Sequence, residues 1–204
     1  MNKGIRMATG QLIGIINASD FFNPDTVSIM VDAARKNPDV GIFHGDINML
    51  NEDGSFFKRK SPDPDLSQHY KGMKVYHPTM FVRKDVYQTL GVYDIQYRIS
   101  ADFDFILRCA LANVKFHYIP EVISNFRVGG VSSVRQNAAM EECAHSLSNN
   151  GYSAEIVASL LGQWRRKARK DALNKRCYDV LRKLLPARIV DFMAANIGKR
   201  DNQG

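Results

Sequence analysis

Short apolar runs separated by polar clusters open the chain. Gln11–Ile16 is rich in isoleucine and is bounded by Gly10 and a polar cluster beginning at Asn17. Such a run is typical of a strand buried on both faces, as in a parallel sheet. Val40–Phe43 is a second run of the same kind.

The segment between these two runs has helical spacing of its apolar residues. Pro24 suits a first helical turn, Asn23 is the expected cap, and the pattern continues to Lys36 before Asn37–Asp39 ends it. The pattern predicts a strand–helix–strand unit with a right-handed crossover.

Further elements follow along the chain. The pattern predicts a hairpin turn at Asn51–Gly54, strands at Tyr76–Val82, Val114–Ile119 and Val122–Phe126, helices at Lys84–Leu90 and Asp102–Asn113, a break at Gly129–Gly130, and helices beyond Val134. We therefore expect a mixed α/β domain over residues 1–133 and a helical, basic C-terminal region over 134–204.

Composition narrows the class of protein. Hydrophobic residues make up 45% of the chain, as in ordinary globular proteins, and no apolar run approaches the ~18–20 residues that cross a bilayer. The N-terminus has no secretory pattern. The three cysteines, Cys109, Cys143 and Cys177, have neither metal-site nor disulfide spacing, so we expect thiols in a reducing, cytoplasmic setting.

Positive charge is concentrated near the C-terminus. Residues 163–200 hold 12 Lys and Arg against 3 Asp, whereas the rest of the chain is nearly neutral. A basic helix of this kind either lies on an anionic membrane surface or presents a solvated face, and the sequence leaves both open. Aromatic residues for base stacking are sparse there, so we expect no nucleic acid partner.

Three carboxylates occupy positions where ligands bind in α/β proteins. Asp20 and Asp46 follow the first two predicted strands, and ligands bind beyond the carboxyl ends of such strands. Asp102 begins a predicted helix, where a cap is the ordinary interpretation. These residues indicate a ligand site near Asp20, and a metal ion could take part in binding the ligand there.

The motifs taken in order are more specific. They are Asn2-Lys3-Gly4-Ile5, Ala8-Thr9-Gly10, Ile13-Gly14 to Ser19-Asp20 with Pro24, His77-Pro78-Thr79, Gly91-Val92-Tyr93-Asp94, Ile99-Ser100-Ala101-Asp102-Phe103, and Phe126-Arg127 to Ser132. Their order and spacing over residues 1–133 resemble glycosyltransferase family 2. The resemblance implies a partial GT-A (Rossmann-like) fold, with a mixed sheet flanked by helices and a helical C-terminal extension.

The resemblance also implies roles for two acids. Asp20 matches the last acid of the family's metal motif, which holds Mn²⁺ or Mg²⁺ against the donor diphosphate. Asp102 matches the general base that takes the proton of the acceptor hydroxyl in an inverting transfer, a role worth ~10²–10⁴-fold in rate.

Other matched positions surround these acids. Asn2, Lys3 and Ser19 match the donor side. His77 and Arg127 match the acceptor or diphosphate side. A second interpretation of His77, of equal weight, is that it orders the turn before Pro78.

Two departures from the family pattern stand out. Ser19 replaces an acid, which leaves Asp20 as a lone carboxylate. The resemblance begins at Met1, past the segment that builds the nucleotide-base pocket in the family, so we expect a truncated member.

The resulting hypothesis is a glycosyltransferase-like enzyme of bacterial surface polysaccharide synthesis. It would move a sugar from a nucleotide-diphosphate donor to a saccharide or lipid-linked acceptor, in the cytoplasm or at the inner face of the plasma membrane. The alternative is an inactive remnant or partner subunit that needs another chain to complete its fold.

Overall fold

The computed structural model describes residues 1–63, 65–129 and 135–184. Its contacts divide the chain into two compact units, Met1–Val157 and Ala158–Gly204. The motif residues from Gly130 to Ser132 and the sequence beyond Leu184 lie outside the described residues.

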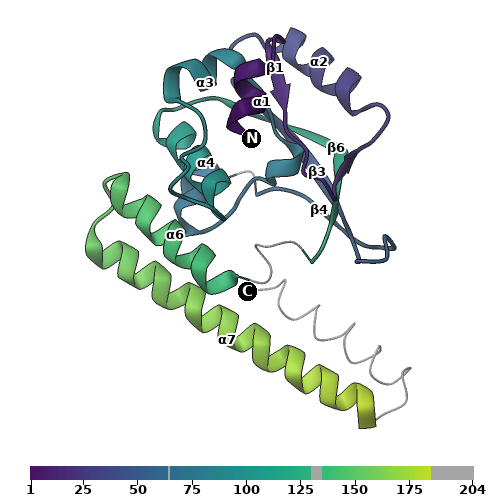
Figure 1. Cartoon of the computed structure of the whole chain (residues 1–204), viewed down its shortest axis with the longest axis vertical. Coiled ribbons are helices and arrows are strands. Elements are labelled where there is room, and N and C mark those ends of the chain that lie inside the picture. The colour runs from purple at the N-terminus through teal and green to yellow at the C-terminus, as the bar shows by residue number, and fades with distance from the viewer. Residues whose placement is uncertain (64, 130–134, 185–204) are drawn as a thin grey trace. The chain divides into compact units, whose positions relative to one another are not determined.

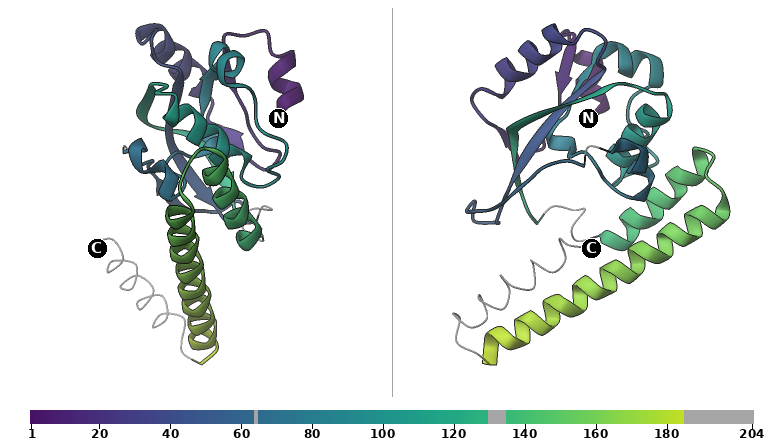
Figure 2. Two further views of the ribbon diagram at one scale, coloured as in Figure 1. Left: turned by 90° about the vertical axis from the view of Figure 1, so that its left-hand side faces the viewer. Right: turned by 180° about the vertical axis from the view of Figure 1, so that it is seen from behind.

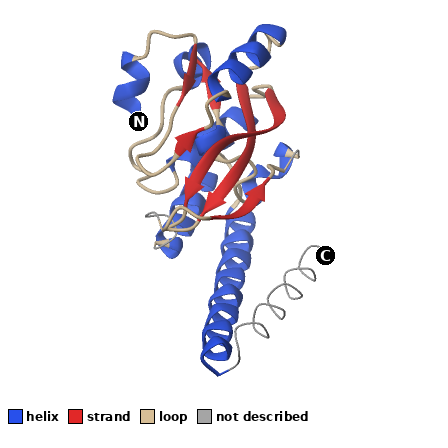
Figure 3. Ribbon diagram, turned by 90° about the vertical axis from the view of Figure 1, so that its right-hand side faces the viewer, coloured by secondary structure: helices blue, strands red, loops and turns tan. Residues whose placement is uncertain are grey.

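A mixed sheet forms the centre of the first unit (Figure 3). Its described strands lie in the order β1-β5-β3-β6-β2, and β4 pairs with β3 outside this path. The bounds are β1 Leu12–Gly14, β2 Phe21–Phe22, β3 Ile42–Leu50, β4 Phe56–Lys60, β5 Phe81–Arg83 and β6 Phe116–Arg127.

The long strands β3 and β6 run parallel and side by side through the unit (Figure 1). Their register shifts on both sides of Asp46, because β6 carries extra residues around Pro120. The strands approach closely at Gly45, where an added Cβ would lie 2.7 Å from the carbonyl oxygens of Ile119 and Glu121. Only glycine fits that position without a backbone shift.

Helices cover both faces of the sheet (Figure 2). On one face α2, Thr26–Lys36, packs Met30 against Phe43 and Phe81. On the other face α3, Lys84–Leu90, and α4, Ala101–Leu111, pack against neighbouring residues of the same strands, Ile42 and Val82. The alternation of β3 and β5 residues between two cores is the expected period of two.

The remaining helices are α1, Asn2–Met7, α6, Gln136–Asn149, and α7, Ala154–Leu184. Two short 3₁₀ turns, η1 and η2, span Leu66–Lys71 and His77–Thr79. The prediction of helices beyond Val134 is confirmed for the described residues. No described helix combines the length and apolarity needed to cross a membrane.

The first predicted strand differs most from the structure. β1 and β3 point the same way, but β5 lies between them and is antiparallel to both. Of the three β1 residues only Ile13 is buried, so the prediction of a strand buried on both faces was wrong. Among the described strands, β1 pairs on one side only, which leaves it at the edge of the sheet.

Smaller corrections concern turns and caps. Tyr76–Val82 divides into η2 and β5 because Pro78 begins a turn. The N-cap of α2 is Asp25, since the amide of Asn23 donates instead to the carbonyl of Val122 at 2.7 Å. The predicted strands on either side of Pro120 form one strand with an irregularity there.

We expect two of the buried histidines, His44 and His69, to make the stability of this fold depend on pH. Burial lowers the pKa of both His44 and His69 to about 4. The unfolded chain binds these protons at pH values where the folded chain does not, so stability present above pH ~6.5 is lost as the pH falls toward 4. We expect the free energy of unfolding to fall by on the order of 1–2 kcal/mol per histidine between pH 7 and 5.

Urea unfolding of the variant His69→Phe checks this prediction. The change keeps an aromatic ring stacked on Phe103 and should flatten the pH dependence. The exposed control His145→Gln should leave it as in the wild type. Equal slopes for His69→Phe and wild type would contradict the role of His69.

Candidate active site

Asp20 is fixed where β2 joins the sheet. Phe21 and Phe22 pair with Asn125 and Ser124 of β6, which brings the preceding carboxylate to the C-terminal end of that strand. Its Oδ1 accepts the backbone N–H of Arg127 at 3.2 Å, and its Oδ2 accepts Nδ2 of Asn17 at 3.2 Å. The Asp20 carboxylate is 8% exposed and receives two neutral donors.

Asp102 lies in the first turn of α4. Its Oδ1 accepts the N–H of the next residue, Phe103, at 2.9 Å. Burial raises the pKa of this carboxyl above its ordinary value, while the His77 imidazole acts in the opposite direction. A raised pKa suits a group that must accept a proton near neutral pH.

His77 connects the two acids. Its imidazole, 7% exposed, has a pKa lowered by burial, and the nearby carboxylates of Asp102 and Asp20 both oppose that shift. The structure therefore places two carboxylates, 82 residues apart in the sequence, near enough to one imidazole for their charges to affect its pKa. Nε2 of His77 lies 2.9 Å from the hydroxyl of Tyr93, whose own pKa burial raises.

The side-chain amide of Asn2 is hydrogen-bonded to the backbone of Tyr93. Its Nδ2 donates to the carbonyl of Tyr93 at 2.7 Å, and its Oδ1 accepts the Tyr93 N–H at 3.2 Å. This double contact ties α1 to the loop that holds the His77 partner. A donor-binding role for Asn2 stays a prediction, and its amide already has a structural use.

The other predicted residues lie nearer the surface. Lys3 is exposed on α1, and Ser19 is exposed in the turn before Asp20. Arg127 contributes its backbone N–H to Asp20, while its guanidinium lies by the hairpin turn, near Gly54 and Asp53. The roles assigned to these side chains stay predictions.

Asp46 does not join the other acids in a ligand cluster. It is buried, and its oxygens accept the Tyr118 hydroxyl at 2.7 Å and Nε of Arg59 at 2.6 Å. The acid after the second predicted strand thus has its charge balanced within the fold.

The donor set at Asp20 suits an ion shared with a substrate. Within residues 1–63, 65–129 and 135–184, no cluster of three or more His, Cys, Asp or Glu residues is placed to hold a metal. Mg²⁺ and similar ions commonly take one or two carboxylates, with phosphate and water oxygens as the other ligands. A single carboxylate such as that of Asp20 fits that pattern if diphosphate and water oxygens supply the other ligands.

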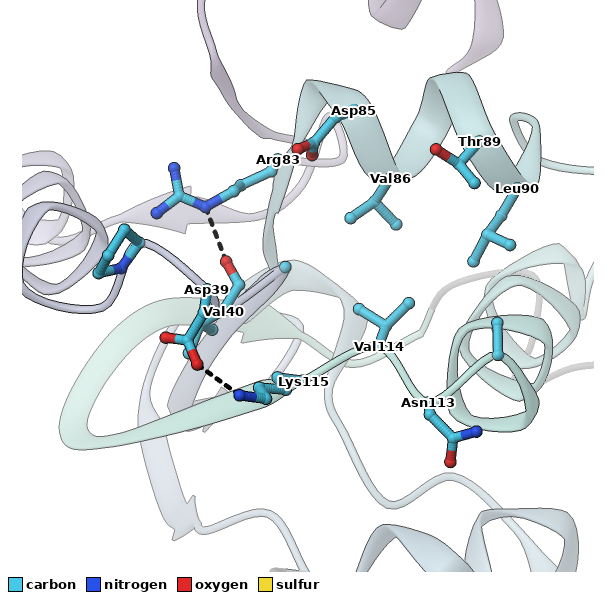
Figure 4. Close-up of a pocket in the computed structure, with 13 residues that line it drawn as sticks. Asp39, Val40, Arg83, Asp85, Val86, Thr89, Leu90, Asn113, Val114 and Lys115 are labelled. Carbon is cyan, nitrogen blue, oxygen red and sulfur yellow. Dashed lines mark hydrogen bonds and ion pairs between the residues drawn. The ribbon is translucent and has the colours of Figure 1, made fainter.

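A surface pocket lies at the other end of the long strands (Figure 4). It has a volume of about 490 Å³, and residues before β3 and β6, together with Arg83 and α3, line it. Nε of Arg83 donates to the carbonyl of Val40 at 2.7 Å, and Lys115 pairs with Asp39. The pocket contains none of the predicted site residues.

Tyr93 and Glu142 were missed as site residues from the sequence. Tyr93 stood in a quoted motif, but its hydroxyl partner is 16 residues away. Glu142 lies outside every motif, on α6, and its charge raises the pKa of Asp102. Only the three-dimensional arrangement shows that Tyr93 and Glu142 lie close to the predicted site residues.

The mixed sheet flanked by helices is that of an α/β protein with a GT-A-like fold. Its structure is similar to the crystal structure of S. aureus TarS residues 1–349, with a TM-score of 0.52 and 13% identity, over 80% of this chain and 48% of that one. At that identity the similarity shows the fold alone.

Sequence comparison adds the family. Residues 1–91 match the family described as Glycosyl transferase family 2. An uncharacterized glycosyltransferase of Methanocaldococcus jannaschii is 27% identical over 135 residues, 62% of this chain and 45% of that protein. An uncharacterized glycosyltransferase of Mycobacterium tuberculosis is 31% identical over 144 residues, 69% and 53% of the two chains.

A third relative is the PGL/p-HBAD biosynthesis glycosyltransferase of Mycobacterium bovis. It is 27% identical over 142 residues, 65% of this chain and 52% of that protein. The chain spans about half the length of the curated relatives that it matches.

The contacts of Asn2 predict separate effects for two neighbouring residues. Asn2→Ala removes both bonds to Tyr93, and we expect a loss of about 1–3 kcal/mol in the free energy of unfolding. Lys3→Ala, at an exposed position, should leave stability unchanged within about 0.5 kcal/mol. Denaturant unfolding measures both, and an unchanged stability of Asn2→Ala would show that the double contact is dispensable.

Proposed function

We propose that this chain carries out an inverting sugar transfer from a nucleotide-diphosphate donor to a saccharide or lipid-linked acceptor. The observation that carries the proposal is the position of Asp20 and Asp102, whose carboxylates both act on the pKa of His77, in a chain whose residues 1–91 match glycosyl transferase family 2. One relative is named for PGL/p-HBAD biosynthesis, and the proposal includes a place in bacterial surface polysaccharide synthesis.

In this proposal Asp102 is the base. Its carboxylate takes the proton from an acceptor hydroxyl as that oxygen forms a bond to the anomeric carbon. The bond from that carbon to the diphosphate oxygen breaks, and the diphosphate leaves with the electron pair on the opposite side. A base with a raised pKa holds the proton more readily once the transfer has begun.

Asp20 serves the donor in the same proposal. Together with the diphosphate it would hold Mn²⁺ or Mg²⁺, which neutralises the charge that develops on the leaving group. Asn2, Lys3 and Ser19 are assigned to the donor side, with the reservation that the Asn2 amide already bonds to Tyr93. His77 and Arg127 are assigned to the acceptor or diphosphate side.

The edge position of β1 favours a second candidate, a subunit that pairs with another polypeptide. Edge strands offer unpaired N–H and C=O groups to an added strand. Such a protein would be an inactive remnant or a partner subunit that needs a second chain. The experiment below separates the two functions, because a chain that needs a partner binds no nucleoside diphosphate alone.

Titration calorimetry with UDP and GDP, each with Mn²⁺ or Mg²⁺, tests the donor assignment. We expect Asp20→Asn to weaken binding by about tenfold or more, since a charged ligand is lost. The control Asp25→Asn, at an exposed position five residues away, should bind as the wild type. Equal affinity of Asp20→Asn and wild type would remove the metal assignment.

The same variants and Asp102→Asn separate binding from chemistry. Asp102→Asn should bind UDP or GDP within about twofold of wild type. Its release of UDP or GDP from a nucleotide-sugar donor in the presence of saccharide acceptors should fall ~10²–10⁴-fold. Full turnover by Asp102→Asn would eliminate it as the base.

We also propose that α7 contacts an anionic membrane surface. The exposed bases of its described part are Arg165, Arg166, Lys167, Arg169, Lys170 and Arg176. Each base near such a surface contributes about 1 kcal/mol. This contact would place transfer at the cytoplasmic face of the membrane, near a lipid-linked acceptor.

Sedimentation with vesicles checks the membrane proposal. The protein should bind vesicles of phosphatidylcholine with phosphatidylglycerol but not phosphatidylcholine alone, and added salt should weaken binding. Arg166→Glu with Lys167→Glu should reduce binding several-fold, whereas the α2 control Arg35→Glu with Lys36→Glu should not. Equal loss in both double variants would assign the effect to net charge instead of α7.

A further inference from the structure

The carboxylate of Glu142 binds three consecutive backbone amides. Oε1 accepts the N–H of Arg98 at 3.1 Å, and Oε2 accepts those of Ile99 and Ser100, each at 2.8 Å. Glu142 lies on α6, whereas the three amides immediately precede α4. Backbone amides at the start of a helix lack intrahelical acceptors, and an anion there is favoured by the helix dipole.

Two more contacts attach α6 to the same part of α4. The Ser100 hydroxyl donates to the carbonyl of Ala139 at 3.0 Å, and the Ser146 hydroxyl donates to Oδ1 of Asp104 at 2.8 Å. Asp102 lies between Ser100 and Asp104, both of which α6 holds. The position of the Asp102 backbone therefore depends on α6.

We propose that Glu142 is a positioning residue for Asp102. Its carboxylate fixes the Arg98–Ser100 segment and thereby the first turn of α4 that presents the base. This inference rests on the proposed function only in giving Asp102 the role of base. Charge-assisted bonds to amides are stronger than neutral ones, so one side chain can hold a three-residue segment.

Glu142 also acts on Asp102 through its charge. The ionisable groups that face Asp102 are His77 from η2, Tyr93 from the loop after α3, and Glu142 and Cys143 from α6. Burial is the main cause of the raised pKa of Asp102, and the negative charge of Glu142 adds to it. Removing that charge lowers the pKa, while the His77 contribution remains.

Two substitutions separate the two effects. Glu142→Gln removes the charge and leaves one acceptor oxygen, whereas Glu142→Asp keeps the charge on a shorter side chain. Glu141→Gln, at the neighbouring and exposed position of α6, is the control. None of the measurements below needs a substrate, so their failure is distinct from a failure of the glycosyltransferase proposal.

Amide hydrogen exchange followed by NMR measures the positioning. We expect the amides of Arg98, Ile99 and Ser100 to exchange about tenfold faster or more in Glu142→Gln and Glu142→Asp, and at the wild-type rate in Glu141→Gln. Wild-type exchange rates in both Glu142 variants would overturn the proposal.

Titration of the aspartate carboxyl ¹³C signals measures the charge effect. The Asp102 signal is assigned by its absence in Asp102→Asn. Its pKa should be lower in Glu142→Gln than in wild type, and it should stay raised in Glu142→Asp and Glu141→Gln. If the contact of Glu142 were purely structural, its loss would speed amide exchange without changing the pKa of Asp102. An unchanged pKa of Asp102 in Glu142→Gln would therefore overturn the proposal.

Discussion

The parallel pairing of β3 with β6 is the constraint on which the rest of the first unit depends. β3 also receives β5 and β4, and β6 receives β2. The pairing of β2 brings Asp20 to the backbone of Arg127, the residue that ends β6. A change in the relation of these two strands would therefore move one carboxylate of the site relative to the other.

The second carboxylate reaches the site through helices. Asp102 depends on the packing of α4 against the core and on the bonds from α6, while His77 depends on η2 and on Tyr93. Several separate parts of the fold thus hold the two acids and the imidazole in place. Low exposure of these groups strengthens their mutual interactions, because water screens buried charges less than exposed ones.

Much of the fold could be predicted from the pattern of apolar residues. The helix Lys84–Leu90 and the hairpin turn ending at Gly54 follow from local signals that no distant residue overrides. β1 was predicted less well, since its burial depends on which strands pair with it, and pairing is not a local property. Asp20 and Asp102 were found through motifs, whereas Glu142 was not, because its partners are backbone amides that any sequence provides.

Gly45 shows how far intolerance to substitution can extend from the candidate site residues. No side chain fits between its Cα and the β6 carbonyls, so every replacement forces the two central strands apart. In a saturation-mutagenesis screen for activity this position would score like a member of the chemical machinery, although it contributes no functional group. A map of mutational sensitivity alone would therefore make the candidate active site look larger than it is.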